Sequence, residues 1–148
     1  MRSALAEHGI VDVIVETESS ARTAQEAADA VSAEIGQIVK SLVFLCDGAP
    51  VMALVSGSNQ LDEAKLSAIA GGAISRANAD GVRAATGFAI GGVAPLGLVT
   101  ALPLYCDEHL LRYDEIWAAA GTPTHVFPIA PARLVEITGA QVCSLARE

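Results

Sequence analysis

The sequence has few aromatic residues and few cysteines, and each shortage narrows what the chain can be. Aromatic residues make up 4% of the 148 residues, against 52% hydrophobic residues in total, so the core must consist mainly of Ala, Val, Leu and Ile. Three cysteines, Cys46, Cys106 and Cys143, form no CxxC pair and are odd in number. This usage is typical of reduced thiols rather than a disulfide framework, and we expect a cytoplasmic protein.

Signals for export or membrane insertion are also lacking. We expect no signal peptide, because residues 1–9 have no apolar stretch and include Glu7 and His8. Residues 84–106 carry no charge and are long enough to span a bilayer. Several Gly and Pro residues interrupt them, which would leave backbone groups unsatisfied in lipid. We therefore expect a loop and a strand here, and no membrane partner.

Positive charge is scarce as well. The chain has 9 Lys and Arg residues against 17 Asp and Glu residues, a formal net charge of −8. Proteins that grip nucleic-acid backbones do so mainly with Lys and Arg on phosphates. We therefore expect no DNA binding, and any RNA contact must depend on a few clustered cations. Candidates for such a cluster are Lys40, Lys65, Arg76 and Arg83.

Common catalytic motifs are absent. The sequence contains no GxxxxGK[ST], GxGxxG or GxSxG pattern. His109 lies beside Asp107 and Glu108, but this spacing is not that of a metal site. We expect neither a metal nor a cofactor.

Short strands and short helices are predicted, mixed without regular βαβ spacing. The expected strands are 11–16, 38–46, 51–56, 73–76, 102–106, 115–119, 125–129 and 142–145. The expected helices follow Thr23, Asp62, Asn78, Asp107 and Pro131, with Gly36 ending the first and residues 47–50 turning the first hairpin. This pattern indicates the α+β class. We expect residues 1–148 to form a single domain with a mixed, strongly curved, barrel-like β-sheet flanked by short helices.

Lys40 is the most unusual residue, because the apolar run 38–46 around it contains only one other polar residue, Ser41. In a strand, Lys40 would share a face with Leu42 and Phe44. Burying an unpaired ammonium group is costly. Lys40 is therefore either a lysine that reaches water from the strand entrance or a cation directed into a pocket.

A glycine-rich segment, residues 86–97, is a second candidate site. Adjacent glycines followed by proline allow backbone N–H groups to approach a ligand closely. Such donors can stabilise an oxyanion without a charged side chain. The segment could equally be a plain connection between a helix and a strand. His125, in a strand-like run, is likewise either a packed residue or part of a site.

Three segments in this order, residues 38–44 (IVKSLVF), 87–97 (GFAIGGVAPLG) and 121–127 (GTPTHVF), resemble the YbaK/prolyl-tRNA-synthetase-associated editing family. The resemblance extends from the helix after Thr23 to Gly139, and residues 55–66 are similar to the family's stretch after its hairpin.

The resemblance implies a cofactor-free deacylase that removes a small mischarged amino acid, alanyl or similar, from the acceptor end of tRNA in trans. The expected tRNA is that for proline, and prolyl-tRNA synthetase or another tRNA carrier could deliver it. The family's loop has Ser before its proline where this chain has Ala94, whereas Ser41 keeps the hydroxyl of the family's Thr. The implied catalytic residues are Lys40, Gly91, Gly92, Val93 and Ala94, and the implied substrate-binding residues are Ser41, Ser56, Gly57, Pro95 and His125.

The bond to be broken is an activated ester, so positioning and oxyanion stabilisation matter more than a strong base. We expect the N–H groups of residues 91–94 to hold the carbonyl oxygen, Lys40 to orient the aminoacyl-adenosine end, and water to be the nucleophile. Two other functions stay open on the sequence alone: a non-catalytic module that binds tRNA or a synthetase, and a hydrolase of small esters.

Overall fold

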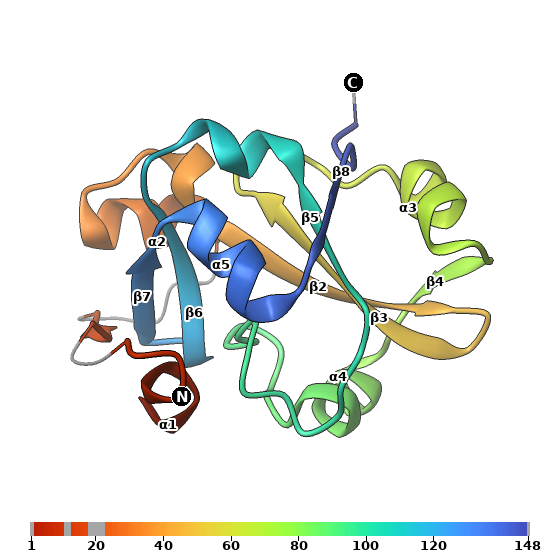
Figure 1. Cartoon of the computed structure of the whole chain (residues 1–148), viewed down its shortest axis with the longest axis horizontal. Helices are drawn as coiled ribbons and strands as arrows, with labels where there is room; N and C mark the ends of the chain where they lie inside the picture. The colour runs from red at the N-terminus through yellow and green to blue at the C-terminus, as the bar shows by residue number, and fades with distance from the viewer. Residues whose placement is uncertain (1, 11–12, 18–22, 148) are drawn as a thin grey trace.

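The structure, a computed structural model, describes residues 2–10, 13–17 and 23–147, and two β-sheets dominate it (Figure 1). One sheet has five strands in the order β4-β2-β3-β5-β8, and the other has three in the order β1-β7-β6. The strands are β1 Val15–Glu16, β2 Val39–Cys46, β3 Ala49–Ser56, β4 Ile74–Arg76, β5 Leu104–Asp107, β6 Ile116–Thr122, β7 His125–Ile129 and β8 Gln141–Cys143. The helices are α1 Arg2–Ala6, α2 Ala24–Val31, α3 Glu63–Ala70, α4 Ala79–Thr86 and α5 Pro131–Thr138, with 3-10 turns η1 Ile35–Gln37 and η2 Glu108–Arg112.

The hairpin of β2 and β3 is the longest pairing in the molecule, and it confirms the predicted hairpin. Asp47 and Gly48 form its turn with φ of 51° and 86°. Positive φ at both turn residues matches the twist of the flanking strands. The turn is tighter than the predicted residues 47–50, because Ala49 and Pro50 already pair with Cys46 and Leu45.

The central strands of the five-stranded sheet are covered on both faces, whereas its edge strands β4 and β8 are largely exposed. One face packs against β6, β7, α4 and α5, and the other packs against α3. The first cluster includes Val39, Val43, Met52, Leu54, Val82, Ile116, Phe127 and Leu134, and the second comprises Phe44, Val51, Ala53, Val55, Leu61, Leu66 and Leu145. Because successive strand residues point to opposite faces, β2 contributes alternately to the two clusters.

The α+β class and the mixed pairing are confirmed, but the barrel-like sheet is wrong. β3–β5 and β5–β8 are parallel, whereas β2–β3 and β2–β4 are antiparallel. Among the described residues, a single bridge between Ile38 and Trp117 links the two sheets. With so little pairing between them, the sheets stay open rather than closing into a barrel.

Helix starts follow the predicted caps at three places. The side chains of Thr23, Asp62 and Asn78 accept backbone N–H bonds at the starts of α2, α3 and α4.

Predicted strand 11–16 is described only in part: residues 11 and 12 lie outside the described residues, and β1 is shorter. No described helix has the length and apolar character needed to cross a membrane.

Two predictions about the ends of helices are wrong. Helix α2 ends at Ser32, which takes φ 57° and donates its N–H to Ala28 and Asp29, so the helix never reaches Gly36. Gly36 is instead buried inside η1. Asp107 precedes η2 but makes no side-chain cap bond.

The Asp107 carboxylate serves a tertiary contact instead of a cap. It is fully buried, and its Oδ1 accepts the Leu145 N–H at 2.9 Å. Its Oδ2 lies 3.4 Å from Asn59 Nδ2. If the Asp107 carboxylate capped η2, the Leu145 N–H and the Asn59 side chain would lack this charged acceptor. The fold instead places the carboxylate between these two distant segments.

Replacing Asp107 by Ala should therefore destabilise the fold. The change leaves the Leu145 N–H buried without its acceptor, which costs about 1–3 kcal/mol. Urea denaturation of Asp107→Ala and of the exposed-site control Asp114→Ala would measure the free energy of unfolding. We expect the control to stay within about 0.5 kcal/mol of wild type. Equal stabilities for both variants would contradict the role assigned to Asp107.

Candidate active site

A pocket of about 730 Å³ opens beside an uncovered edge of β2. On one side β3 pairs with all of β2, whereas on the other side β4 pairs only with Phe44–Cys46. The next contact along that edge is the Ile38–Trp117 bridge. The strand edge between these two contacts forms a wall of the pocket. Lining residues include Ala24, Ala27, Lys40, Ser41, Val43, Leu61, Glu63, Arg76, Val82, Ile90, Gly91, Val93, Trp117, Ala119, Thr122, Pro123 and Arg147.

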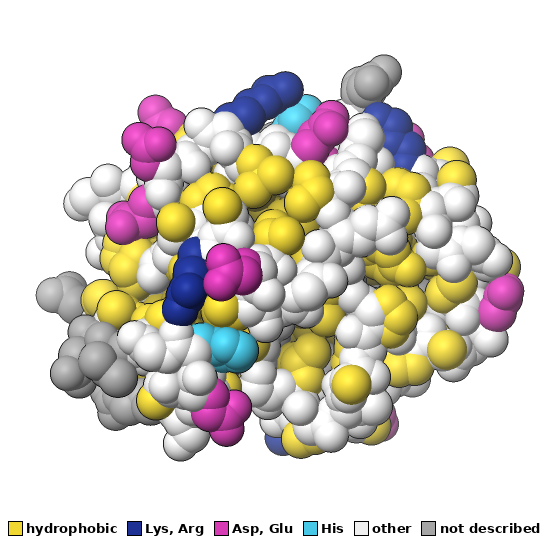
Figure 2. Space-filling model, viewed as in Figure 1, with side chains coloured by type: hydrophobic (Ala, Val, Ile, Leu, Met, Phe, Trp, Pro, Cys, Tyr) yellow, Lys and Arg dark blue, Asp and Glu magenta, His cyan; other side chains and the backbone are white. Residues whose placement is uncertain are grey.

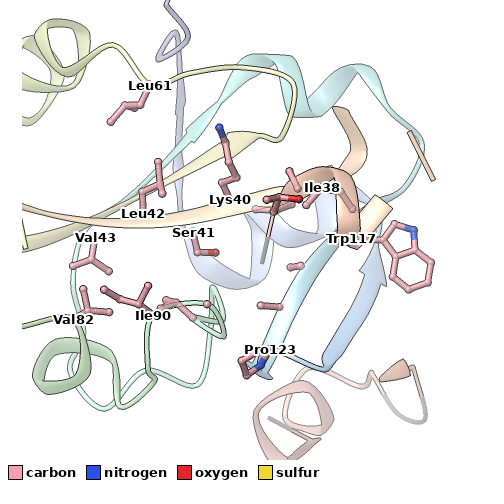
Figure 3. Close-up of a pocket in the computed structure, with 18 of the residues that line it drawn as sticks. Ile38, Lys40, Ser41, Leu42, Val43, Leu61, Val82, Ile90, Trp117 and Pro123 are labelled. Atoms are coloured by element: carbon pink, nitrogen blue, oxygen red, sulfur yellow. The ribbon is translucent and has the colours of Figure 1, made fainter. Parts of the chain in front are cut away.

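Strand β2 divides the pocket into two chemically different sides. Figure 3 shows Lys40 and Leu42 on one side of the strand, and Ser41 and Val43 on the other, toward Val82 and Ile90. The sequence hypothesis placed Lys40 and the glycine loop around one reacting group. In the structure they line one pocket from opposite faces of β2, so a ligand that contacts both must cross the strand edge.

Lys40 is partly buried, and its Nζ donates a hydrogen bond to the Asn59 carbonyl. Burial lowers the pKa of Lys40 below its ordinary value. The Asn59 side chain is held in turn, with Nδ2 2.8 Å from His109 Nδ1. The ammonium group therefore has a defined position, supplied by a backbone carbonyl and not by a carboxylate.

The glycine loop contributes Gly91 and Val93 to the pocket wall. Gly92 is buried, and its N–H donates to the Ala89 carbonyl at 3.1 Å, so this donor is already used. A Cβ on Gly92 would lie 2.7 Å from Thr122 Cα, which explains why glycine is needed where the loop crosses the β6–β7 turn. Within the described chain, the N–H groups of Gly91, Val93 and Ala94 donate no hydrogen bond.

Other predicted site residues lie outside the pocket wall. Ser56 is buried and donates to the Gly36 carbonyl at 2.7 Å. Gly57 gives its N–H to Ile38, and a Cβ there would meet the Ile35 carbonyl at 2.5 Å. Both residues shape the end of the β2–β3 hairpin. Ala94 and Pro95 are buried in the base of the glycine loop.

His125 makes contacts on both ring nitrogens. Its Nδ1 lies 2.6 Å from Thr122 Oγ1, and its Nε2 lies 3.4 Å from Glu16 Oε2. Thr122 and Pro123, which precede it, line the pocket, but His125 itself does not. In this arrangement His125 orders the β6–β7 turn beneath the glycine loop.

The pocket lining has more cations than carboxylates, the reverse of the balance in the whole chain. Lys40, Arg76 and Arg147 line the pocket with one carboxylate, Glu63, although the whole chain carries −8. None of the three lies within 4 Å of a carboxylate in the described structure. On the face of the molecule drawn in Figure 2, cations are scattered between apolar and acidic side chains.

The predicted cation cluster was only partly right. Arg76 is in the pocket, but Lys65 instead donates to the Ala146 carbonyl, and Arg83 is not a lining residue. Sequence reasoning missed Arg147, which the pairing of residues 60–61 with the C-terminal segment brings to the pocket. It also missed Trp117, whose position depends on the bridge to Ile38. No local signal marks either residue.

Two of the three thiols, those of Cys106 and Cys143, are unsuited to nucleophilic catalysis. Burial, reinforced by Asp107 and Cys143, raises the pKa of Cys106 to about 12. Burial also raises the pKa of Cys143, and all three cysteines are free. In the part of the chain that the structure describes, no group of three or more His, Cys, Asp or Glu side chains could hold a metal ion.

The family of the chain follows from a comparison with known proteins. Residues 18–137 match the aminoacyl-tRNA editing domain. The chain belongs to this family. It is therefore an editing hydrolase whose substrate is aminoacyl-tRNA, as the resemblance of its three segments implied.

Individual members of the family show how similar the chain is to them. A crystal structure of a candidate trans-editing enzyme for prolyl-tRNA synthetase superposes with a TM-score of 0.94 at 49% identity, covering 99% of this chain and 94% of that one. EbsC of Enterococcus faecalis, whose name proposes a Cys-tRNA(Pro)/Cys-tRNA(Cys) deacylase, is 28% identical over 83% of this chain and 76% of its own. A proline–tRNA ligase of Maridesulfovibrio salexigens is 34% identical over 70% of this chain, which corresponds to 18% of the ligase.

The lowered pKa of Lys40 predicts a stability cost in this editing domain. The folded protein holds the Lys40 proton less tightly than the unfolded chain does, so the charge destabilises the fold at pH values below the lowered pKa. This penalty shrinks as pH rises from the lowered pKa to the ordinary lysine pKa and is gone above it. Lys40→Met, which keeps the aliphatic stem, should therefore raise the thermal midpoint at pH 7, and the gain should shrink at alkaline pH.

Lys65→Met is the matched control, because Lys65 donates to Ser144 and to the Ala146 carbonyl. Calorimetry at neutral and alkaline pH would measure both variants. A midpoint for Lys40→Met clearly below that of wild type at pH 7 would show that burial of Lys40 does not oppose folding.

Proposed function

We propose that the chain removes a small mischarged amino acid, alanyl or a similar unbranched group, from tRNA(Pro) in trans, acting in the cytoplasm as a single editing domain over residues 1–148. The observation that carries this proposal is the meeting of Lys40, the open edge of β2 and the unpaired N–H groups of the glycine loop in one pocket. A pocket of about 730 Å³ is in the range that takes a small-molecule group such as an aminoacyl-adenosine end.

The two sides of β2 suit the two ends of this substrate. Arg76 pairs with Phe44 across β2 and β4, so its side chain shares the face of Lys40. This cationic side suits the ribose and phosphates of the terminal nucleotides. The uncharged side, with Gly91 and Val93, suits the aminoacyl group.

The glycine loop would stabilise the charge that develops on the ester carbonyl oxygen. The N–H groups of Gly91 and Val93 are the available donors on the pocket wall, since Gly92 is bonded to Ala89 and Ala94 lies outside the wall. Backbone donors fixed before the reaction need no reorganisation when the oxyanion forms. Water attacks the carbonyl carbon, the ester bond to the ribose oxygen breaks, and the ribose hydroxyl and free amino acid are released. Lys40 holds the terminal nucleotide in place.

Selectivity would come from the size of the pocket. Alanines at positions 24, 27 and 119 line it together with bulkier side chains such as Trp117. Close packing rejects larger groups by overlap, but one methylene changes affinity by only about 1–3 kcal/mol. Small groups should therefore be separated weakly from one another and strongly from proline.

A panel of aminoacyl-tRNAs tests this function. Wild-type protein should deacylate Ala-tRNA(Pro), and more weakly Ser- or Cys-tRNA(Pro), while sparing Pro-tRNA(Pro). Lys40→Ala should lower kcat/KM by about 100-fold, the scale of losing one fixed electrostatic contact. Arg83→Ala removes an exposed cation outside the pocket and should match wild type. If no tRNA is deacylated, the chain is a binding module, and equal rates on free aminoacyl esters would indicate a small-ester hydrolase.

Salt dependence tests the cationic side of the pocket. At about −0.7 per phosphate, contact with two or three phosphates should make log kcat/KM fall against log salt with a slope of about −1.4 to −2.1. Replacing both Arg76 and Arg147 by Ala should flatten the slope by about 1.4, whereas Arg83→Ala should leave it unchanged. A steep slope in wild type, or an unchanged slope in the double variant, would rule out this small contact set.

A further inference from the structure

Ser41 carries a polar group with no visible use in the fold. Its Oγ is buried and has no hydrogen-bond partner, and it is the one buried side-chain N or O atom in this condition among the described residues. Buried hydroxyls are normally paired, and leaving one unpaired costs free energy. Ser41 lines the pocket, and Figure 3 shows its side chain on the face of β2 opposite Lys40. A ligand in the pocket is the partner that the fold does not provide.

The backbone of Ser41 faces the same space. Gly57 donates its N–H to Ile38, which shows that Ile38 turns its carbonyl toward β3. In an antiparallel pair, alternate residues direct their N–H and C=O groups to opposite edges. Lys40 therefore bonds toward β3, and Ser41 directs its N–H and C=O toward the edge that β4 leaves open.

We propose that Ser41 binds the α-ammonium group of the aminoacyl substrate, through its hydroxyl and carbonyl oxygens, so that the enzyme selects esters with a free amino group. This inference rests on the function proposed above. The α-carbon is bonded to the ester carbonyl carbon, so an ester held by the loop near Gly91 and Val93 brings its ammonium to this part of β2. Hydroxyl and carbonyl oxygens both accept hydrogen bonds, and ammonium has three donors.

The arrangement of charge supports an ammonium at Ser41 rather than an anion or a ribose phosphate. Lys40 and Arg76 lie on the opposite face of β2, and the side of Ser41 is lined by Val43, Val82 and Val93. A substrate that crosses the strand edge thus keeps its phosphates on the cationic face and its ammonium among uncharged acceptors. Repulsion between the ammonium and Lys40 is limited by their separation on opposite faces of β2.

The test compares the effect of one change in the enzyme with the effect of one change in the substrate, as a double-mutant cycle does. Wild type, Ser41→Ala and Ser41→Thr are assayed with Ala-tRNA(Pro) and with propionyl-tRNA(Pro), which lacks only the amino group, each corrected for spontaneous hydrolysis. Because hydrogen bonds to charged groups are the strong ones, Ser41→Ala should lower kcat/KM for the alanyl ester by about 10-fold or more. The propionyl ester should change less than about 2-fold, since the two effects are not additive for groups in contact. Ser41→Thr keeps the hydroxyl and should retain the preference for the alanyl ester.

Other outcomes overturn the inference. An equal loss on both esters would place the Ser41 hydroxyl on the ribose or in the fold, and no loss on either would leave it without a substrate contact. The thermal midpoint of Ser41→Ala should not fall, because the variant removes an unpaired buried hydroxyl; a fall would show a structural role. If wild type hydrolyses propionyl-tRNA(Pro) as well as Ala-tRNA(Pro), ammonium selection is wrong while the editing function stands. If wild type hydrolyses neither ester, the proposed function itself fails.

Discussion

The incomplete pairing of β2 is the constraint on which the rest of the site depends. β3 covers one edge over the full strand, but β4 stops at Phe44 and the next bridge is at Ile38. A strand edge left open inside a domain exposes backbone donors and acceptors that normally find partners. Here the gap is a pocket wall, so backbone and side chains from both faces of one strand become available to a ligand.

This geometry lets a strongly acidic chain handle an anionic substrate. Lys40, Arg76 and Arg147 line the pocket with a single carboxylate, Glu63, although the whole chain has an excess of acidic residues. Few phosphates can be neutralised by so small a set, so binding depends on the acceptor end rather than on the body of the tRNA. Burial disfavours the charge of Lys40, but the Asn59 carbonyl accepts a hydrogen bond from its ammonium group. The Asn59 side chain is itself held by a contact to His109.

The glycine loop and the β6–β7 turn act as one support. Gly92 approaches the Thr122 backbone so closely that no side chain fits, and His125 bonds to Thr122 from the other side. Several residues implied by the family resemblance therefore hold the loop and the hairpin in shape. The groups that face the pocket are fewer: Lys40, Ser41, Gly91 and Val93.

The sequence by itself determined the local elements, because their signals are local. The caps at Thr23, Asp62 and Asn78 and the turn at Asp47 and Gly48 lie within the segments they shape. Only the tertiary structure decided which side chains share the pocket. The register of β4 on β2 puts Arg76 opposite Phe44, on the same face of β2 as Lys40. Pairing of the C-terminal segment with residues 60–61 brings Arg147 to the pocket, so both positions depend on contacts between residues far apart in the chain. Asp107 illustrates the difference: its position in the sequence predicts a helix cap, but in the structure its carboxylate contacts Leu145 and Asn59, which are distant in the chain.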